Sequence, residues 1–314
     1  MIGSPWRIIF FGTPIFAIPT LKNLLQGPDE VVAVVTQPDR EKGRGRKVIP
    51  SPVKELALQH GLTLLQPEKV REEGFQEKIK SLQPELFVVL AYGQILPRFL
   101  LQIPKYGAVN VHASLLPKYR GAAPIAWAIL KGERVTGVTT IMMDEGMDTG
   151  DILLQTEIPI GEEETSETLH DRLALLGAKL LLETVSGMKA GNVHPIPQDH
   201  LKVTYAPPLK KEDGRIDWSK EGKEIDRQVR ALNPWPGAFT EWNGKLLKIF
   251  RGEVREEISK GKAGMVSWVG SDFIEVETGK NFFLIKEVQL EGKRRMTIRE
   301  FLAGHQIPVG TAFC

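Results

Sequence analysis

Asn110 and His112 are the two residues of this sequence whose types and spacing best suit chemistry. They lie in the segment 108–112, for which we predict a short strand, and residues two apart in a strand point to the same side. An amide and an imidazole that face one spot can bind an oxygen on which negative charge develops. A charged imidazole can also donate a proton. The pair therefore predicts an oxyanion site, although the same pattern also occurs as an ordinary polar pair on a strand.

An acidic segment at 142–151 could supply a carboxylate partner for His112. It contains Asp144, Glu145, Asp148 and Asp151, together with two glycines that allow sharp turns. The alternatives are a solvated loop or a divalent-cation site, but the spacing fits no standard calcium loop. The remaining histidines are scattered along the chain and form no metal-ligand spacing, so we expect no metal.

Between these two segments runs Ser114–Gly121, which begins with serine, two leucines and a proline. Such a turn at the end of a strand could form a rigid apolar wall for a flat heteroaromatic ligand, or could serve packing alone. The turn Phe11–Pro14 resembles a phosphate-binding turn but lacks the three-glycine fingerprint. A nicotinamide dinucleotide site is therefore disfavoured.

The elements that would position these residues alternate between strand and helix. Apolar runs predict strands at 7–11, 30–36, 63–65, 86–91, 108–112, 135–143 and 151–160. Helical spacing predicts helices at 15–26, 51–60, 75–82 and 165–188. This alternation indicates an α/β fold with a mostly parallel sheet, which binds ligands outside the carboxyl ends of its strands. The turns after Phe11, Ala91 and His112 are therefore expected at the site.

The composition changes near residues 191–208, where four prolines interrupt regular structure. We predict a catalytic domain at 1–204, a linker at about 191–209 and a C-terminal domain at 210–314. A helix at 223–231 followed by strands at 245–250, 264–269, 272–276 and 282–288 predicts a small antiparallel sheet or barrel.

The bulk composition narrows the class of protein. Hydrophobic residues make up 42%, charged residues 25%, and the formal net charge is +2, as in ordinary globular proteins. The single cysteine, Cys314, allows no intrachain disulfide, which fits a reducing compartment. No apolar run has the length of a membrane span. We therefore expect a cytoplasmic protein without a membrane partner.

Taken together, Asn110, His112, the Ser114–Pro117 turn and the Asp148–Asp151 loop resemble the folate-dependent formyltransferases. The similarity is greatest to the methionyl-tRNA formyltransferase branch, and it extends over essentially the whole chain. Further matching stretches are Phe11–Pro14, Thr36–Arg40, Gly43–Gly45, Pro50–Lys54, Ala91–Gly93, Ser114–Pro124 and Asn233–Ala238.

The resemblance implies a Rossmann-like formyltransferase domain followed by a C-terminal antiparallel β-barrel of OB-like topology. It implies transfer of the formyl group of 10-formyltetrahydrofolate to the α-amine of methionine on initiator tRNA, without a metal. Asn110, His112 and Asp148 carry over as the catalytic trio. Whether His112 or Asp148 handles the decisive proton stays open. The folate site would be lined by Ser114, Leu115, Leu116, Pro117 and, less directly, Tyr92.

A basic run at 39–47 has five positive and two negative residues and contains two glycines. In isolation, such a run is typical of a solvated surface loop. The resemblance implies that it binds the tRNA acceptor stem, with Arg44 entering the stem. The phosphates would then be contacted by Arg40, Lys42, Arg46 and Lys47.

Two other functions are compatible with parts of this pattern. A folate-dependent formyltransferase or hydrolase acting on a small amine would not need the basic run. A non-catalytic tRNA-binding protein would not need Asn110, His112 and Asp148. The joint pattern favours the tRNA formyltransferase, which the resemblance implies to be a monomer.

Overall fold

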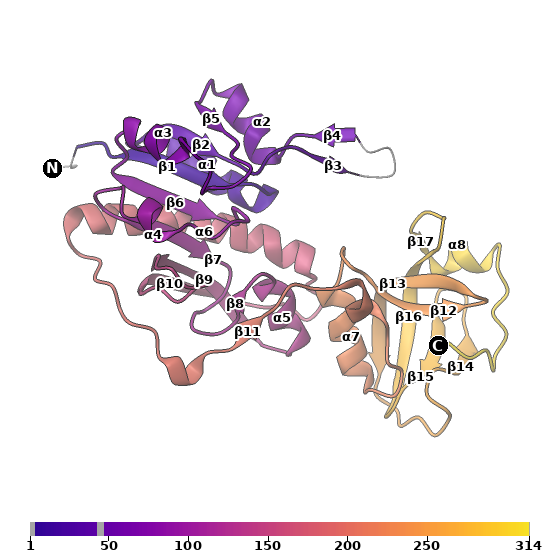
Figure 1. The fold of residues 1–314 in the computed structure, drawn as a ribbon. Coiled ribbons are helices and arrows are strands. Elements are labelled where there is room, and N and C mark those ends of the chain that lie inside the picture. The colour runs from indigo at the N-terminus through magenta and orange to yellow at the C-terminus, as the bar shows by residue number, and fades with distance from the viewer. Residues whose placement is uncertain (1–3, 43–46, 314) are drawn as a thin grey trace. The chain divides into compact units, whose positions relative to one another are not determined.

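The computed structural model describes residues 4–42 and 47–313, and it separates into two compact units (Figure 1). The N-terminal unit comprises Met1–Pro124, Val135–Pro159 and His170–Ala206. The C-terminal unit comprises Ile125–Arg134, Ile160–Leu169 and Pro207–Cys314. Each unit is made of several separate ranges of the chain, so the domain boundaries predicted from the sequence stay a prediction.

The N-terminal unit is built on a seven-stranded sheet with the order β10-β9-β7-β6-β1-β2-β5. β7, β6, β1, β2 and β5 run parallel to one another, whereas β9 is antiparallel to both β7 and β10. The strands are β1 (Arg7–Gly12), β2 (Glu30–Val35), β5 (Leu64–Leu65), β6 (Leu86–Leu90), β7 (Ala108–His112), β9 (Val135–Met142) and β10 (Ile152–Pro159). The expected α/β sheet is confirmed, and the predicted strands agree with these bounds closely.

The central strands are continuous apolar runs because helices cover both faces of a parallel sheet. All five residues of β6 are buried, as are the last five of β1. The helices of this unit include η1 (Ile15–Ala17), α1 (Ile18–Gln26), α2 (Pro52–Gln59), α3 (Phe75–Ser81), α4 (Arg98–Leu101) and most of α6 (Ser166–Ala190). From Ile125 onward, α5 (Pro124–Leu130) belongs to the C-terminal unit. Gly177 of α6 lies so close to Val111 and Val138 that a Cβ there would overlap Val111. The helix therefore covers the face of β7 opposite to Asn110 and His112.

Two small strand pairs were not expected from the sequence. β3 (Arg40–Lys42) and β4 (Lys47–Ile49) pair antiparallel and lie apart from the main sheet (Figure 1). β8 (Arg120–Gly121) pairs in parallel with β11 (Tyr205–Ala206), so the proline-rich segment after α6 is part of the N-terminal unit. Its prolines interrupt a long α-helix but are compatible with an extended strand.

The C-terminal unit has an antiparallel sheet with the order β12-β13-β16-β15-β14, and β17 pairs with β16. Its strands are β12 (Ala238–Trp242), β13 (Lys245–Arg255), β14 (Val266–Val269), β15 (Ile274–Glu277), β16 (Phe282–Leu290) and β17 (Met296–Thr297). Its helices include η3 (Lys211–Gly214), α7 (Gly222–Ala231) and α8 (Ile298–Leu302), whereas η2 (His200–Lys202) belongs to the N-terminal unit. Trp218, Phe283 and Phe301 lie in one apolar core of this unit. The expected antiparallel sheet is confirmed; its closure into a barrel stays a prediction.

None of the helices in the described ranges is both long and apolar enough to span a membrane.

Candidate active site

The turns at the carboxyl ends of three parallel strands are tied together by Thr13. Its hydroxyl donates to the backbone carbonyl of Tyr92 at 2.9 Å and accepts from the backbone N–H of Gln37 at 3.2 Å. The turns after β1, β2 and β6 therefore form one connected edge, as expected for a parallel sheet.

Asn110 and His112 lie on the neighbouring strand β7 and share one of its faces. Asn110 pairs with Val89 of β6 and with Ile141 of β9, and its side chain is only partly buried. Among residues 4–42 and 47–313, its amide has no side-chain hydrogen bond. A partly exposed amide at this position can donate to an oxygen of a ligand.

The His112 ring is buried and has one neighbour on each nitrogen. Nε2 lies 2.9 Å from the backbone carbonyl of Tyr119. Nδ1 lies 3.5 Å from Asp148 Oδ1. Because a carbonyl can only accept, Nε2 must carry a hydrogen, and the other nitrogen faces the carboxylate. The structure thus brings together two of the residues that the sequence singled out.

Asp148 reaches His112 by a route that sequence spacing could not indicate. β9 is antiparallel to β7, and the backbone N–H of Met143 bonds to Ala108 at the amino end of β7. The loop 143–151 must therefore run back along β7, a distance of roughly 13 Å at about 3.3 Å per residue. There the other carboxylate oxygen, Asp148 Oδ2, accepts the backbone N–H of Gly121 at 2.8 Å.

The backbone of this loop is tightly constrained. Asp148 has a φ of 56°, in the left-handed region that few residues other than glycine adopt. A Cβ at Gly150 would lie 1.8 Å from the carbonyl oxygen of Met142, so only glycine fits there. The loop therefore has a tightly defined backbone conformation, unlike a freely solvated acidic segment.

The turn after β7 is held by hydroxyl and amide groups from β9 and β10. Thr139 Oγ1 accepts from the backbone N–H of Leu116 at 3.0 Å, and Gln155 donates to the Leu116 carbonyl at 2.7 Å. Ser114 and Leu116 are buried, whereas Leu115 and Pro117 are partly exposed. Contacts of Ser114–Pro117 with folate stay a prediction, for which Leu115 and Pro117 have the accessible side chains.

Tyr92 lies within the apolar core of the N-terminal unit. Its ring meets that of Phe11 edge-on at 5.4 Å, and its burial raises the pKa of the phenol. The structure gives this ring a packing role, so a folate contact of Tyr92 rests on the sequence alone.

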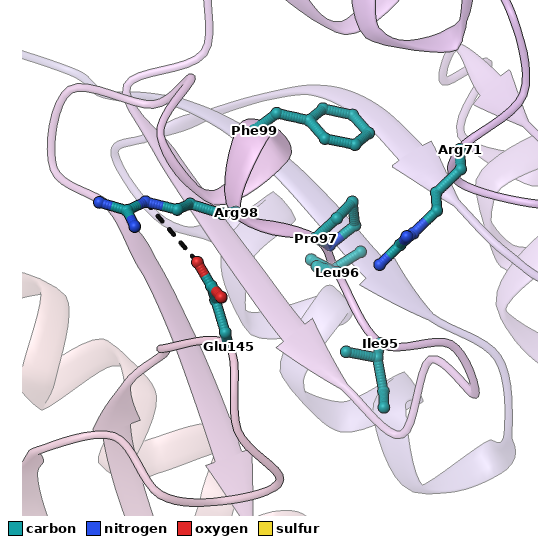
Figure 2. A pocket seen from close by; sticks show the side chains of 7 residues that line it. All are labelled: Arg71, Ile95, Leu96, Pro97, Arg98, Phe99 and Glu145. Carbon is teal, nitrogen blue, oxygen red and sulfur yellow. Dashed lines mark ion pairs between the residues drawn. The ribbon is translucent and has the colours of Figure 1, made fainter.

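A pocket of about 320 Å³ lies beside the Asp148 loop (Figure 2). It is lined by the segment 95–99, which is apolar apart from Arg98, and by one charged residue from each of two other segments: Arg71, Ile95, Leu96, Pro97, Arg98, Phe99 and Glu145. Arg98 Nε lies 3.6 Å from Glu145 Oε1, and both side chains are largely exposed. The sequence analysis did not predict this pocket, although the isoleucine, leucine and proline at 95–97, in the turn that follows a buried strand, were a usable signal.

The basic run is only partly described. Arg40 is exposed on β3, and the backbones of Lys42 and Lys47 lie on β3 and β4. Arg44 and Arg46 lie outside the described residues. Contacts of all five with tRNA stay predictions.

Comparisons with known proteins address the whole chain. Residues 6–185 match the family described as Formyl transferase, and residues 208–306 match Formyl transferase, C-terminal domain. A relative from Citrifermentans bemidjiense, named methionyl-tRNA formyltransferase, is 53% identical over 304 residues, covering 97% of this chain and 95% of the relative.

Two solved structures share the fold at low identity. WlaRD, a sugar 3N-formyl transferase crystallised in the presence of dTDP and 5-N-formyl-THF, has a TM-score of 0.67 at 20% identity, covering 93% of this chain and 100% of that one. HypX from Aquifex aeolicus, in complex with tetrahydrofolic acid, has a TM-score of 0.65 at 20% identity, covering 98% of this chain and 51% of that one.

Proposed function

The chain belongs to the formyl transferase family, and from that premise we propose that it formylates the α-amine of methionine on initiator tRNA. The formyl donor is 10-formyltetrahydrofolate. The observation that carries the proposal is near-complete coverage at 53% identity by a relative named for this reaction. It is supported by the proximity of His112 and Asp148, since a formyl-transfer site needs them and a tRNA-binding module does not.

The reaction forms a bond between the amine nitrogen and the formyl carbon and breaks the bond from that carbon to N10 of the folate. Attack by the neutral amine places negative charge on the formyl oxygen in a tetrahedral intermediate. The Asn110 amide, which is partly exposed, is the donor that we assign to this oxygen. When the intermediate collapses, the amine has lost a proton and N10 has gained one.

His112 and Asp148 are the groups that we assign to this proton movement. Nε2 of His112 is engaged by the Tyr119 carbonyl, so the Nδ1 side, toward Asp148, is where a proton can be exchanged. Asp148 holds one oxygen on Gly121 and keeps the other near the ring. A carboxylate in this place can accept a proton from the amine through water, or orient a charged imidazole toward the leaving nitrogen.

The pocket beside the Asp148 loop is the place that we assign to the folate. Its volume of about 320 Å³ falls at the lower end of the range for small-molecule sites. Ile95 and Phe99, whose side chains are exposed, provide apolar surface for an aromatic ring, and Arg71 provides a positive charge for the carboxylates of a glutamate tail. Glu145 joins the pocket to the same loop that bears Asp148.

The tRNA would be bound by the basic hairpin of β3 and β4 and by the C-terminal unit. We further propose that the catalytic domain ends near residue 204, that the domain from residue 210 closes into an OB-like barrel, and that the chain acts as a cytoplasmic monomer. The basic hairpin favours a polyanionic substrate because phosphate contacts supply most of the affinity of such complexes.

The decisive experiment is a formylation assay with 10-formyltetrahydrofolate and three acceptors: charged initiator tRNA, free methionine and an amino sugar nucleotide. We expect formyl transfer to the charged tRNA alone. Formylation of a small amine in place of the tRNA would favour the small-amine transferase. Release of formate without any acceptor would favour a hydrolase, and tRNA binding without turnover would favour a binding protein.

A further inference from the structure

Gln198 is a buried glutamine in the proline-rich segment after α6, and its side-chain amide donates two hydrogen bonds and accepts two. Its Nε2 donates to the backbone carbonyls of Asp148, at 2.8 Å, and Gly150, at 2.7 Å. Its Oε1 accepts from Nε and Nη2 of Arg120, at 3.1 and 2.7 Å. Both side chains are at least 95% buried. The amide therefore links the Asp148 loop to the strand β8.

The Asp148 loop needs such a link because of how it is built. It starts beside the amino end of β7 and must fold back to reach His112. It contains four carboxylates between residues 144 and 151, whose mutual repulsion opposes a compact path. Asp148 itself has left-handed backbone geometry, which persists only where the surroundings impose it.

The strand β8 and the residue before it contact both Asp148 and His112. The backbone N–H of Gly121 donates to the Asp148 carboxylate, and the carbonyl of Tyr119 accepts from His112. Tyr119 and Arg120 are in turn fixed by Thr204: its hydroxyl accepts from the N–H of Tyr119 at 2.8 Å and its carbonyl from that of Arg120 at 2.9 Å. Residues 198–206 thus fix both partners of the His112–Asp148 contact.

We propose that Gln198 is a positioning residue for formyl transfer: through two donated hydrogen bonds it sets the place of Asp148 relative to His112. The proposal rests on the proposed function. Gln198 does not touch the reacting atoms in this assignment, so its loss should reduce kcat more than it raises KM for either substrate.

The test is Gln198→Glu. A carboxylate still accepts from Arg120, now as a charge-assisted pair, but it cannot donate to the two loop carbonyls and repels them. The matched control is Gln228→Glu on α7, because Gln228 also donates to two backbone carbonyls, those of Asp213 and Arg215. We expect kcat to fall at least tenfold in Gln198→Glu with KM changed less than about threefold, and Gln228→Glu to stay within twofold of the parent.

Hydrogen–deuterium exchange provides a readout without turnover. Faster exchange confined to 143–151 in Gln198→Glu, and absent in Gln228→Glu, supports the role of Gln198 in positioning the loop. Failure of the parent protein to formylate tRNA would refute the proposed function and not this role. The proposal would be overturned if Gln198→Glu had the same loop exchange and the same kcat as the parent protein. It would also be overturned if the loss of kcat disappeared on cooling, because the variant would then only be less stable. If that variant does not fold, Arg120→Lys decides: it keeps the charge but loses the fork to Gln198, and an unchanged kcat with unchanged loop exchange would refute the proposal.

Discussion

The backbone carbonyl of Tyr119 lies 2.9 Å from Nε2 of His112, and this contact determines which ring nitrogen carries a proton. Since a carbonyl only accepts, the neutral ring would turn a lone pair from Nδ1 toward the carboxylate of Asp148. Only the imidazolium has a hydrogen for each neighbour. The two neighbours of the ring are therefore both hydrogen-bond acceptors.

Replacement of His112 by alanine tests the ring directly. We expect kcat to fall by on the order of 10² to 10⁴, the usual range for loss of a general acid or base, with tRNA binding retained. Because the site is buried, folding must be checked by circular dichroism before kinetics are compared. Normal turnover in a folded His112→Ala protein would remove His112 from the mechanism.

Replacement of Asp148 by asparagine tests the contact between its carboxylate and His112. The amide keeps an oxygen for the Gly121 N–H but removes the negative charge that faces His112. We expect a kcat loss of roughly 10²-fold or more, because the proton partner is lost without a change of shape. Asp171→Asn is the matched control, since Asp171 Oδ1 lies 3.0 Å from Nδ1 of its neighbour His170 on the exposed side of α6. Equal effects of the two changes would argue against a special role for Asp148.

Substitution of Arg71 by alanine tests the assignment of the pocket to folate. An exposed ion pair contributes at most about 1 kcal/mol, so we expect KM for the folate to rise by about three- to fivefold while KM for tRNA is unchanged. The effect should be smaller for a donor that lacks the glutamate tail. A rise in KM for tRNA instead would assign Arg71 to the other substrate.

The sequence predicted the sheet well and its small connections poorly. The run 86–91 is recognisable because it is apolar throughout, as burial on both faces requires, whereas in 108–112 only one face is apolar and the other carries Asn110 and His112. The pairing of β8 with β11 joins residues 85 positions apart over two residues each, and no local periodicity can reveal it. The same holds for α8, a helix of five residues.

In the candidate site, too, some positions could be predicted from the sequence and others could not. Asn110 and His112 share a face because they lie two apart on one strand, which spacing alone indicates. Asp148 approaches from an antiparallel strand through a loop that folds back, and its position depends on Gly121 and Gln198. The resemblance to a family placed Asp148 in the site; the physical reason for its position became visible only in the structure.

Replacement of Arg44 by alanine tests the tRNA assignment of the basic run. Arg44 lies outside the described residues, so this prediction rests on the sequence. Loss of one phosphate or base contact should raise KM for charged tRNA and, if phosphate is the partner, reduce the slope of log affinity against log salt by about one. KM for the folate should not change. Lys80→Ala on α3, where Lys80 pairs with Glu77, is a control for loss of one surface charge.

Glu300 of the C-terminal unit offers a prediction about stability and pH. Its carboxylate accepts from Arg294 at 2.7 Å and from the backbone N–H of Thr297 at 2.9 Å, at the start of α8. The Arg294 contact, followed by those of Thr297, lowers the pKa of Glu300 to about 2 from 4.5. A lowered carboxyl pKa stabilises the folded state fully above 4.5, and this stabilisation is lost as the pH falls toward 2. Glu300→Gln should therefore lower Tm at pH 7, and the difference in Tm from the parent protein should shrink between pH 4.5 and pH 2. Glu253→Gln is the control. It changes a largely exposed carboxylate 3.5 Å from Lys286 and should change Tm little. A Tm difference that stays constant over this range would mean that Glu300 acts through shape rather than charge.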